Sequence, residues 1–196
     1  MGGVLPVWRI ETARLTIRRW SAGDANALAA ARSEGLERGV SVEEAVEALE
    51  RWCRRFDQND DFVYAAWARD PDALVGGVGA HPRFGPGSFE IGYWLRPSAT
   101  GQGLATEMAG AMTRVAFEVE RVPLVEIRCA RSNTASAAIA ARLGYVHDAT
   151  LPRRVPLATG GLEDVLVFAM FAEGYEASAA RGFVASAFDG EGRRVL

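Results

Sequence analysis

Alternation of hydrophobic and polar residues marks most of the strands that this sequence predicts. In residues 12–20, Ala13, Leu15 and Ile17 alternate with polar side chains, which predicts a first strand. Alternation or short apolar runs predict further strands over residues 62–68, 74–80, 89–95, 124–130, 145–150 and 165–171. The Asp-Pro-Asp sequence at 70–72 has the chemistry of a tight turn, so we expect the strands on either side of it to be antiparallel.

Hydrophobic residues three or four positions apart predict helices over residues 21–33, 42–56, 104–120 and 134–143. Ser41 and Glu44 form a capping box in front of the second helix, whose periodicity is the clearest in the chain. Gly144 stands where a glycine commonly ends a helix. The tail, residues 172–196, is weakly patterned, and the sequence predicts no regular structure there.

The order of these elements predicts an α+β fold with one central mixed sheet. Strands 89–95 and 124–130 flank a single helix, so we expect them to form a right-handed crossover and to lie parallel. The remaining strands should be antiparallel, with helices on both faces of the sheet. No linker-like segment divides the chain, and we expect one domain over residues 1–171 followed by the tail.

Residues 89–106 combine a strand, a glycine turn and the start of a helix. Pro97 cannot donate to a sheet ladder, so the strand should end near Arg96. Gly101 and Gly103 then let the backbone turn freely or approach a ligand closely. Free N–H groups at a helix N-terminus bind anions, most naturally a pyrophosphate here. Taken alone, a Gly-x-Gly pattern is weak evidence for such a site. It also fails the dinucleotide fingerprint, because Thr106 stands where the third glycine is required.

The run Glu-Ile-Gly-Tyr-Trp-Leu-Arg-Pro, followed by Thr-Gly-Gln-Gly-Leu-Ala-Thr-Glu, resembles the acetyl-CoA-binding segment of GNAT N-acetyltransferases. It is most similar to the branch that includes the ribosomal-protein N-terminal acetyltransferases. A second segment agrees: Asn133-Thr-Ala-Ser136 is followed by an Ala-rich helix and by Leu-Gly-Tyr at 143–145. The resemblance extends from about residue 11 to residue 171. The leading Gln or Arg of the family pattern is missing, because Ser98 occupies that position.

The resemblance implies the three-layer GNAT fold, in which the two parallel strands splay apart and the pantetheine arm of acetyl-CoA lies in the gap. It assigns the acetyl-CoA site to Leu95, Arg96, Gly101, Gln102, Gly103, Leu104, Ala105, Thr106 and Asn133. Asn133 is expected to fix the loop before its helix or to touch the pantetheine, and it also fits a helix cap.

Acetyl transfer to an amine requires a base for the amine and a proton for the departing thiolate. By resemblance Glu90 is the expected base, with a plain ion pair to a neighbouring arginine as the alternative. Many GNAT enzymes place a tyrosine acid where this chain has Ala140. The branch of ribosomal-protein N-terminal acetyltransferases is similar at Ser136, so the resemblance implies that Ser136 hydrogen-bonds the sulfur or relays a proton from water. The alternative is an ordinary residue of the first helical turn.

Composition and net charge argue against several classes of partner for this chain. Apolar residues make up 49% of the chain and the net charge is −3, so neither nucleic acid nor a membrane surface is an expected partner. No signal peptide or membrane span is visible, and we expect a cytoplasmic protein. Cys53, Cys129, His81 and His147 lack metal-ligand spacing, so no metal is expected, and both histidines are expected to be structural or solvent-facing.

The sequence thus predicts an N-acetyltransferase that moves acetyl from acetyl-CoA directly to a primary amine. Branch resemblance favours the α-amino terminus of a protein or peptide. One alternative acceptor is a small amine such as an antibiotic, a polyamine or an amino acid. A second alternative, favoured by Ala140, is a non-catalytic acyl-CoA-binding module. A homodimer through the last strands or the tail is a further expectation.

Overall fold

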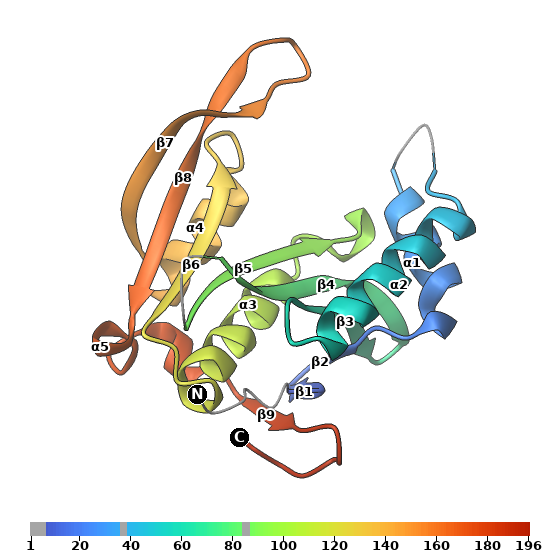
Figure 1. Ribbon diagram of the computed structural model, residues 1–196. Coiled ribbons are helices and arrows are strands. Elements are labelled where there is room, and N and C mark those ends of the chain that lie inside the picture. Colours follow the sequence, from blue (N-terminus) through green and yellow to red (C-terminus); the bar gives the residue numbers. More distant parts are fainter. Residues whose placement is uncertain (1–6, 36–38, 84–86) are drawn as a thin grey trace.

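The computed structural model describes residues 7–35, 39–83 and 87–196. Within these residues nine strands form one sheet in the order β7-β8-β6-β5-β4-β3-β2-β1-β9 (Figure 1). The strands are β1 (Arg9–Thr12), β2 (Leu15–Arg19), β3 (Phe62–Arg69), β4 (Asp72–Pro82), β5 (Ser88–Leu95), β6 (Leu124–Ala130), β7 (Val146–Pro156), β8 (Leu162–Phe171) and β9 (Ala185–Phe188). β5 and β6 are parallel and every other neighbouring pair is antiparallel, which confirms the predicted topology.

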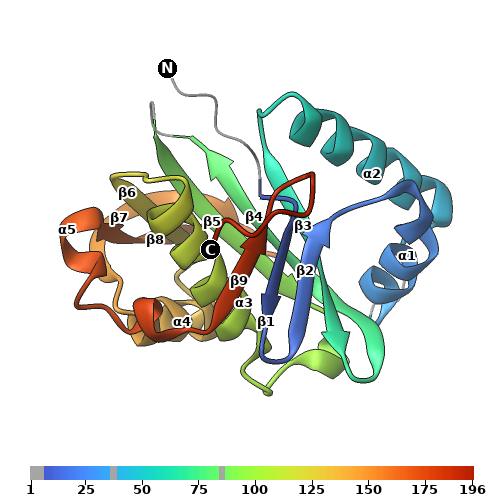
Figure 2. The same ribbon diagram turned by 90° about the horizontal axis from the view of Figure 1, so that it is seen from below.

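Helices cover both faces of this sheet, as Figure 2 shows from below. The α-helices are α1 (Ala25–Ser33), α2 (Val42–Asp57), α3 (Leu104–Arg114), α4 (Thr134–Leu143) and α5 (Ala172–Tyr175). α3 and α4 pack on one face over the larger core cluster, which contains Met108, Met112 and Leu143. α1 and α2 pack on the opposite face over a smaller cluster centred on Trp20 and Leu49. The mixed α+β layers expected from the sequence are therefore confirmed.

The N-terminal hairpin differs from the prediction of one strand over residues 12–20. β1 and β2 pair antiparallel across a turn at residues 13–14, with Ile10 opposite Ile17. The side-chain hydroxyl of Thr12 accepts a hydrogen bond from the Leu15 N–H at 3.0 Å and so closes this turn. The alternation continues through the turn in the sequence, which is why the pattern does not reveal it.

β7 and β8 are longer than the predicted strands 145–150 and 165–171. β7 continues through Pro152 and Pro156, and its register shifts between His147 and Ala149 and again between Leu151 and Val155. Prolines are tolerated on an edge strand, where one side of the backbone has no ladder to complete. The hairpin therefore projects beyond the rest of the sheet (Figure 1).

Two further segments differ from the sequence pattern. α3 ends at Arg114 and passes into a π-helical turn, Val115–Val119, instead of continuing as an α-helix. The tail, for which no regular structure is expected, carries α5 and β9, and β9 pairs antiparallel with β1. A Cβ atom at Gly110 would lie 2.7 Å from the ring of Phe183, so the absence of a side chain on α3 makes room for the tail.

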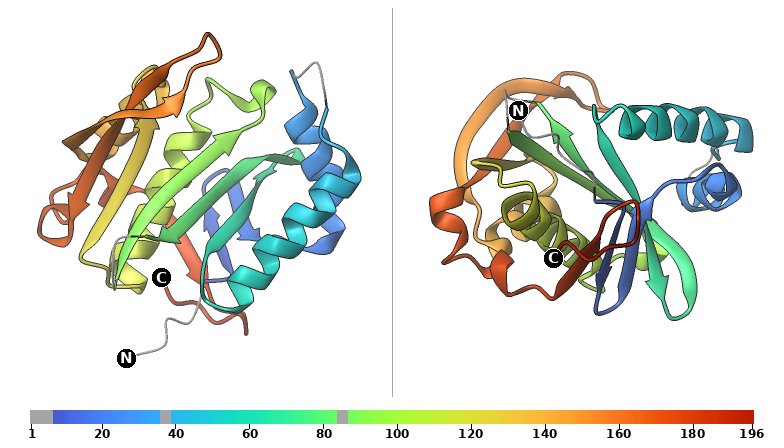
Figure 3. Two further views of the ribbon diagram at one scale, coloured as in Figure 1. Left: turned by 45° about the horizontal axis from the view of Figure 1, so that its top comes forward. Right: turned by 60° about the horizontal axis from the view of Figure 1, so that its bottom comes forward.

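β5 and β6 stay paired for only three residues and then diverge. Their register pairs are Ser88 with Leu124, Phe89 with Val125 and Glu90 with Glu126. Beyond Glu90 the two strands separate toward their C-terminal ends (Figure 3), while β6 remains paired with β8 along its whole length. The expected splayed strand pair is therefore present, and we call it the fork.

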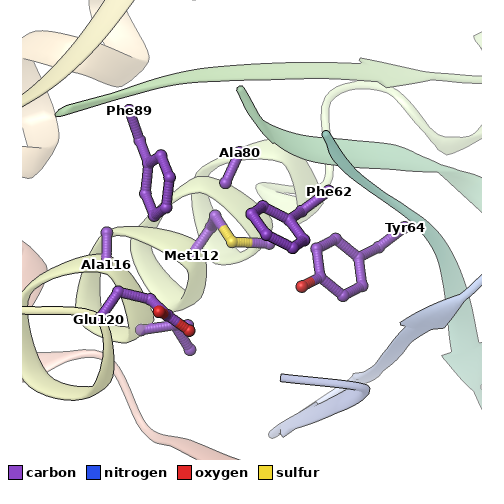
Figure 4. Close-up of a pocket in the computed structure, with 8 residues that line it drawn as sticks. Phe62, Tyr64, Ala80, Phe89, Met112, Ala116 and Glu120 are labelled. Atoms are coloured by element: carbon purple, nitrogen blue, oxygen red, sulfur yellow. The ribbon is translucent and has the colours of Figure 1, made fainter. Parts of the chain in front are cut away.

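One carboxyl group, that of Glu120, lies next to residues of the larger core cluster. Glu120 follows the π-helical turn and lies beside Phe89, Met112 and Ala116 at a small apolar cavity of about 10 Å³ (Figure 4). A cavity of this volume holds about one water molecule and is too small for a ligand. Burial raises the pKa of Glu120 to about 7, because an apolar environment disfavours the charged carboxylate.

Glu120→Gln is expected to change the pH dependence of stability. A raised folded-state pKa means that the stability contributed by the neutral acid is fully present below the unfolded pKa of about 4.5 and is lost as pH rises through about 7. From pH 4 to pH 8, the free energy of unfolding of the variant should therefore rise by about 1–2 kcal/mol relative to that of the wild type, after allowance for solvent screening. Urea unfolding at both pH values measures this gain. Glu50→Gln, at an exposed position of α2, is the control, and an equal difference at both pH values would contradict the prediction.

Candidate active site

The loop between β5 and α3 has the geometry of an anion site. Gly101 has φ 75° and Gly103 has φ 77°, both in the left-handed region that glycine adopts without strain. The first N–H of α3 with a backbone acceptor in the helix is that of Glu107, which donates to the Gly103 carbonyl at 3.1 Å. The N–H groups of Leu104 and Ala105 therefore belong to the first turn, where no helical acceptor exists, and the positive end of the helix dipole lies behind them.

The start of α3 is fixed by a buried carboxylate. Glu107 accepts hydrogen bonds from the Thr12 hydroxyl at 2.6 Å and from the Arg14 backbone N–H at 2.9 Å. It also pairs with the Arg14 guanidinium at 2.6 Å. Burial raises the pKa of Glu107, but these hydrogen bonds and the nearby positive charge outweigh burial and lower it overall. Arg14 also donates to the Gln102 carbonyl at 2.9 Å, so the β1–β2 turn holds both the loop and the helix start.

A cleft of about 570 Å³ lies between β5, the glycine loop and α4. It is lined by Tyr93, Trp94, Leu95, Thr100, Gly101, Gly103, Ala105, Thr106, Asn133, Ala135, Ser136, Ala138, Ile139 and Arg142. Asn133 caps α4, because its side-chain oxygen accepts from the Ser136 N–H at 3.1 Å. The cleft joins the anion site at one end to the fork at the other.

A pair of hydroxyl groups lies at the side of this cleft. The Tyr93 hydroxyl and the Ser136 Oγ are 2.9 Å apart. Burial raises the pKa of Tyr93 to about 12, although its hydrogen bond to Ser136 lowers it in part. The phenol therefore remains protonated at neutral pH and can donate a proton. Ala140 is fully buried in the core, so the hydroxyl next to the cleft comes from β5 and not from position 140 of α4.

The opposite face of β5 carries the acidic group predicted as a base. Glu90 is half-buried and points to the α1–α2 face, as do Gly92 and Trp94 by strand alternation. Its nearest cation is Arg83, with Nε 3.6 Å from Oε2. Glu90 belongs to the last parallel pair, opposite Glu126, which pairs with Arg128 at 2.8 Å. Glu90 thus stands at the closed end of the fork.

A histidine lies directly across the sheet from Glu90. His81 on β4 is the cross-strand partner of Glu90, and its Nδ1 contacts the Asp61 carboxylate at the start of β3. The other oxygen of Asp61 pairs with Arg55 of α2 at 2.9 Å. Burial raises the pKa of Asp61, but the hydrogen bond from His81 and the adjacent positive charge lower it overall. The sequence prediction of a structural or solvent-facing His81 does not anticipate this contact.

The structure groups most of the predicted site residues around one cleft. The predicted residues that line it are Leu95, Gly101, Gly103, Ala105, Thr106, Asn133 and Ser136. Arg96, Gln102 and Leu104 instead line a neighbouring cleft of about 360 Å³, and Arg96 pairs with Glu34. The sequence pattern does not reveal the Tyr93 hydroxyl pair or the Asp61–His81 contact, since both join residues far apart in the chain.

Other chemistries receive no support from the residues that the structure describes. Among residues 7–35, 39–83 and 87–196, no group of three or more metal-ligating side chains is found. Cys53 and Cys129 are both free thiols. No helix in the described part of the chain is long and apolar enough to cross a membrane.

Comparison with known proteins adds a family context. The profile described as "Acetyltransferase (GNAT) domain" matches residues 14–146. Over 152 residues the chain is 25% identical to the uncharacterized N-acetyltransferase YnaD of Bacillus subtilis (strain 168), which covers 75% of this chain and 88% of that protein.

Two solved structures share the fold. Mycobacterium smegmatis RimJ in complex with CoA-disulfide has a TM-score of 0.74 at 22% identity, covering 89% of this chain and 91% of that chain. RimL, a ribosomal L7/L12 alpha-N-protein acetyltransferase solved in complex with coenzyme A, has a TM-score of 0.71 at 20% identity, covering 85% and 97%. The GNAT-like fold expected from the sequence is confirmed.

Gly101→Ala tests the anion site against a matched control. Gly101 and Gly160 both have left-handed φ angles, 75° and 88°, and an added Cβ would meet nothing within 4 Å at either position. Each alanine should therefore cost about 1–2 kcal/mol of stability through backbone strain alone. Only Gly101→Ala should also weaken CoA binding, by about tenfold in titration calorimetry, because it displaces the backbone N–H groups of the anion site. Equal CoA affinity in the two variants would contradict the assignment.

Proposed function

The chain belongs to the GNAT family of acetyltransferases, and from that premise we propose that it transfers acetyl directly from acetyl-CoA to a primary amine. The main support for this proposal is the fork between β5 and β6. Past Glu90 the β5 backbone has no partner strand on its β6 side, so its polar groups are open to an extended ligand that binds like an added strand. The glycine loop lies at the mouth of the same cleft.

The residues present fit acetyl-CoA. N–H groups of the loop and of the first turn of α3, residues 101–106, would hold the pyrophosphate, with Leu95 and Asn133 beside the pantetheine arm. When bound, acetyl-CoA supplies an acetyl group activated as a thioester. Arg96 pairs with Glu34 and would act by fixing the loop, because Glu34 also accepts hydrogen bonds from Ser98.

The two faces of the sheet would divide the proton transfers. Glu90, on the α1–α2 face, would accept a proton from the amine directly or through water. Tyr93 and Ser136, on the α3–α4 face, would donate to the departing sulfur, with the tyrosine as the proton source and the serine as its hydrogen-bond partner. Each positioned group of this kind contributes ~10²–10⁴-fold to a rate. No covalent enzyme intermediate is needed, since the fork lets both substrates reach one point from opposite faces.

The acceptor we favour is the α-amino terminus of a protein or peptide. The support is the names of two fold neighbours, RimJ and the alpha-N-protein acetyltransferase RimL. A small-molecule amine is the alternative acceptor for the same site.

The experiment combines acetyl-CoA binding with thiol-release turnover. Calorimetric titration of acetyl-CoA precedes assays with peptides that carry a free α-amino group, with the same peptides blocked at that group, and with an amino acid, a polyamine and an aminoglycoside. Free peptides should turn over and blocked ones should not. Glu90→Gln should lower kcat by about 10²-fold while acetyl-CoA affinity stays unchanged.

Glu173→Gln, at an exposed position of α5, is the matched control and should behave as the wild type. Faster turnover of a small amine than of any peptide would replace the favoured acceptor class. Unchanged kcat in Glu90→Gln would remove Glu90 as the base. Tight acetyl-CoA binding without turnover of any amine would contradict the proposed reaction.

Tyr93→Phe separates the two hydroxyl groups. Loss of the phenol should lower kcat by about 10²-fold with peptide acceptors, because the thiolate loses its proton source. Ser136→Ala should lower kcat less, since the phenol remains. Both variants should show near-normal activity when the thioester carries a leaving thiol of low pKa that needs no protonation. A Tyr93→Phe rate that falls equally for both leaving groups would assign the hydroxyl a structural role.

A further inference from the structure

We propose that His81, oriented by Asp61, is a second proton-accepting residue of this site and that the proton released by the acceptor amine ends on its Nε2. The inference rests on the proposed transferase function and adds a residue that the sequence treats as structural. The geometry that supports it involves β4, β5 and the loop before β3.

One ring nitrogen of His81, Nδ1, already has a hydrogen-bond partner. Nδ1 contacts the carboxylate of Asp61, which is only 5% exposed. Asp61 is itself held by Arg55, whose Nη1 lies 2.9 Å from Oδ2. A carboxylate held in this way accepts the Nδ1 proton and leaves Nε2 as the unprotonated nitrogen of the neutral ring. The arrangement fixes both the tautomer and the direction of the ring.

The other ring nitrogen lies over two glycines, one on β4 and one on β5. A Cβ at Gly79 would lie 2.5 Å from Nε2, and a Cβ at Gly92 would lie 3.4 Å from it. The imidazole therefore lies flat on sheet surface that any side chain at Gly79 would occupy. Gly92 is the first residue on this face of β5 past the last parallel pair, so Nε2 lies beside the part of β5 that borders the fork. Among the described residues no hydrogen bond to Nε2 is found.

The charged groups around His81 come from three elements and two loops. They are Asp61 before β3, Arg55 on α2, Arg83 after β4, Glu90 on β5, and Glu126 with Arg128 on β6. Arg55 and Arg128 are paired with carboxylates, and Arg83 lies 3.6 Å from Glu90. An ammonium group that approaches the fork from this face therefore meets Glu90 and the free nitrogen of His81 together.

The proton balance of the transfer explains why a second acceptor is useful. A protonated amine must lose one N–H proton before its lone pair can attack the thioester carbon. Imidazole is the side chain that most readily accepts a proton near neutral pH, whereas a carboxylate alone retains one poorly. The first proton passes to Nε2, directly or by way of Glu90, and later to solvent. As the C–N bond forms and the C–S bond breaks, the second amine proton passes to Glu90 and then to solvent. The sulfur takes a proton from the Tyr93–Ser136 pair, which solvent reprotonates.

The test compares His81→Gln with His147→Gln, the same substitution at the exposed histidine of β7. Each variant and the wild type is assayed at pH 7 with two acceptors, a peptide α-amine that is mostly protonated and methoxyamine, which is not. His81→Gln should lower kcat/KM for the peptide by about 10²-fold or more and lower it far less for methoxyamine. Asp61→Asn should act in the same direction, and acetyl-CoA affinity should not change in any variant.

A second variant guards against an effect on folding. Gly79→Ala keeps the histidine but places a Cβ where the ring now lies, so it should reproduce the same preference for the unprotonated acceptor. Thermal unfolding of every variant is measured alongside. A role limited to structure would lower kcat/KM equally for both acceptors, and that result would overturn the proposal.

The failure of this inference and the failure of the proposed function give different results. If the wild type turns over amines and His81→Gln behaves as His147→Gln, only the role of His81 is overturned. If the wild type binds acetyl-CoA but acetylates no amine, the proposed reaction fails and the role of His81 fails with it.

Discussion

The divergence of β5 and β6 after three residue pairs is the constraint on which the site depends. A continuous parallel pair would bury its backbone groups in a ladder and leave no passage through the sheet. Here β6 keeps its pairing to β8 while β5 keeps its pairing to β4, so each strand is supported from its outer side. The opening between them is therefore stable without a ligand, and its polar edges are already in place.

This opening gives the two faces of the sheet different chemical roles. Hydroxyl groups from β5 and α4 gather on the face covered by α3 and α4. Carboxylates and an imidazole from three strands and a loop gather on the face covered by α1 and α2. The alternation of side chains along β5 places Tyr93 on one face and Glu90 on the other, so one strand contributes to both groups.

Most of the fold can be predicted from the sequence, because local patterns of residues determine most of its strands and helices. Alternation locates most of the strands, the capping box at Ser41 and Glu44 is present as expected, and one crossover helix implies the parallel pair. The site is predicted only where it is local, in the glycine loop and the helix that begins at residue 134. The contact between Asp61 and His81 joins the loop before β3 to β4, and Tyr93 meets Ser136 across 43 residues. Neither pairing leaves a periodic signal, so sequence patterns alone do not show them.

The two outer strands of the sheet also have a consequence for self-association. β7 carries two prolines and two register shifts, so its outer backbone does not offer a regular row of donors and acceptors. At the other end, the chain folds back on β9, where Val195 donates to the Ala187 carbonyl at 2.8 Å. Both edges thus resist the strand-to-strand addition that leads to aggregation. The last residues of the chain act as a cover for its hydrogen-bonding edge, and their removal would expose a strand on which fibrils could grow.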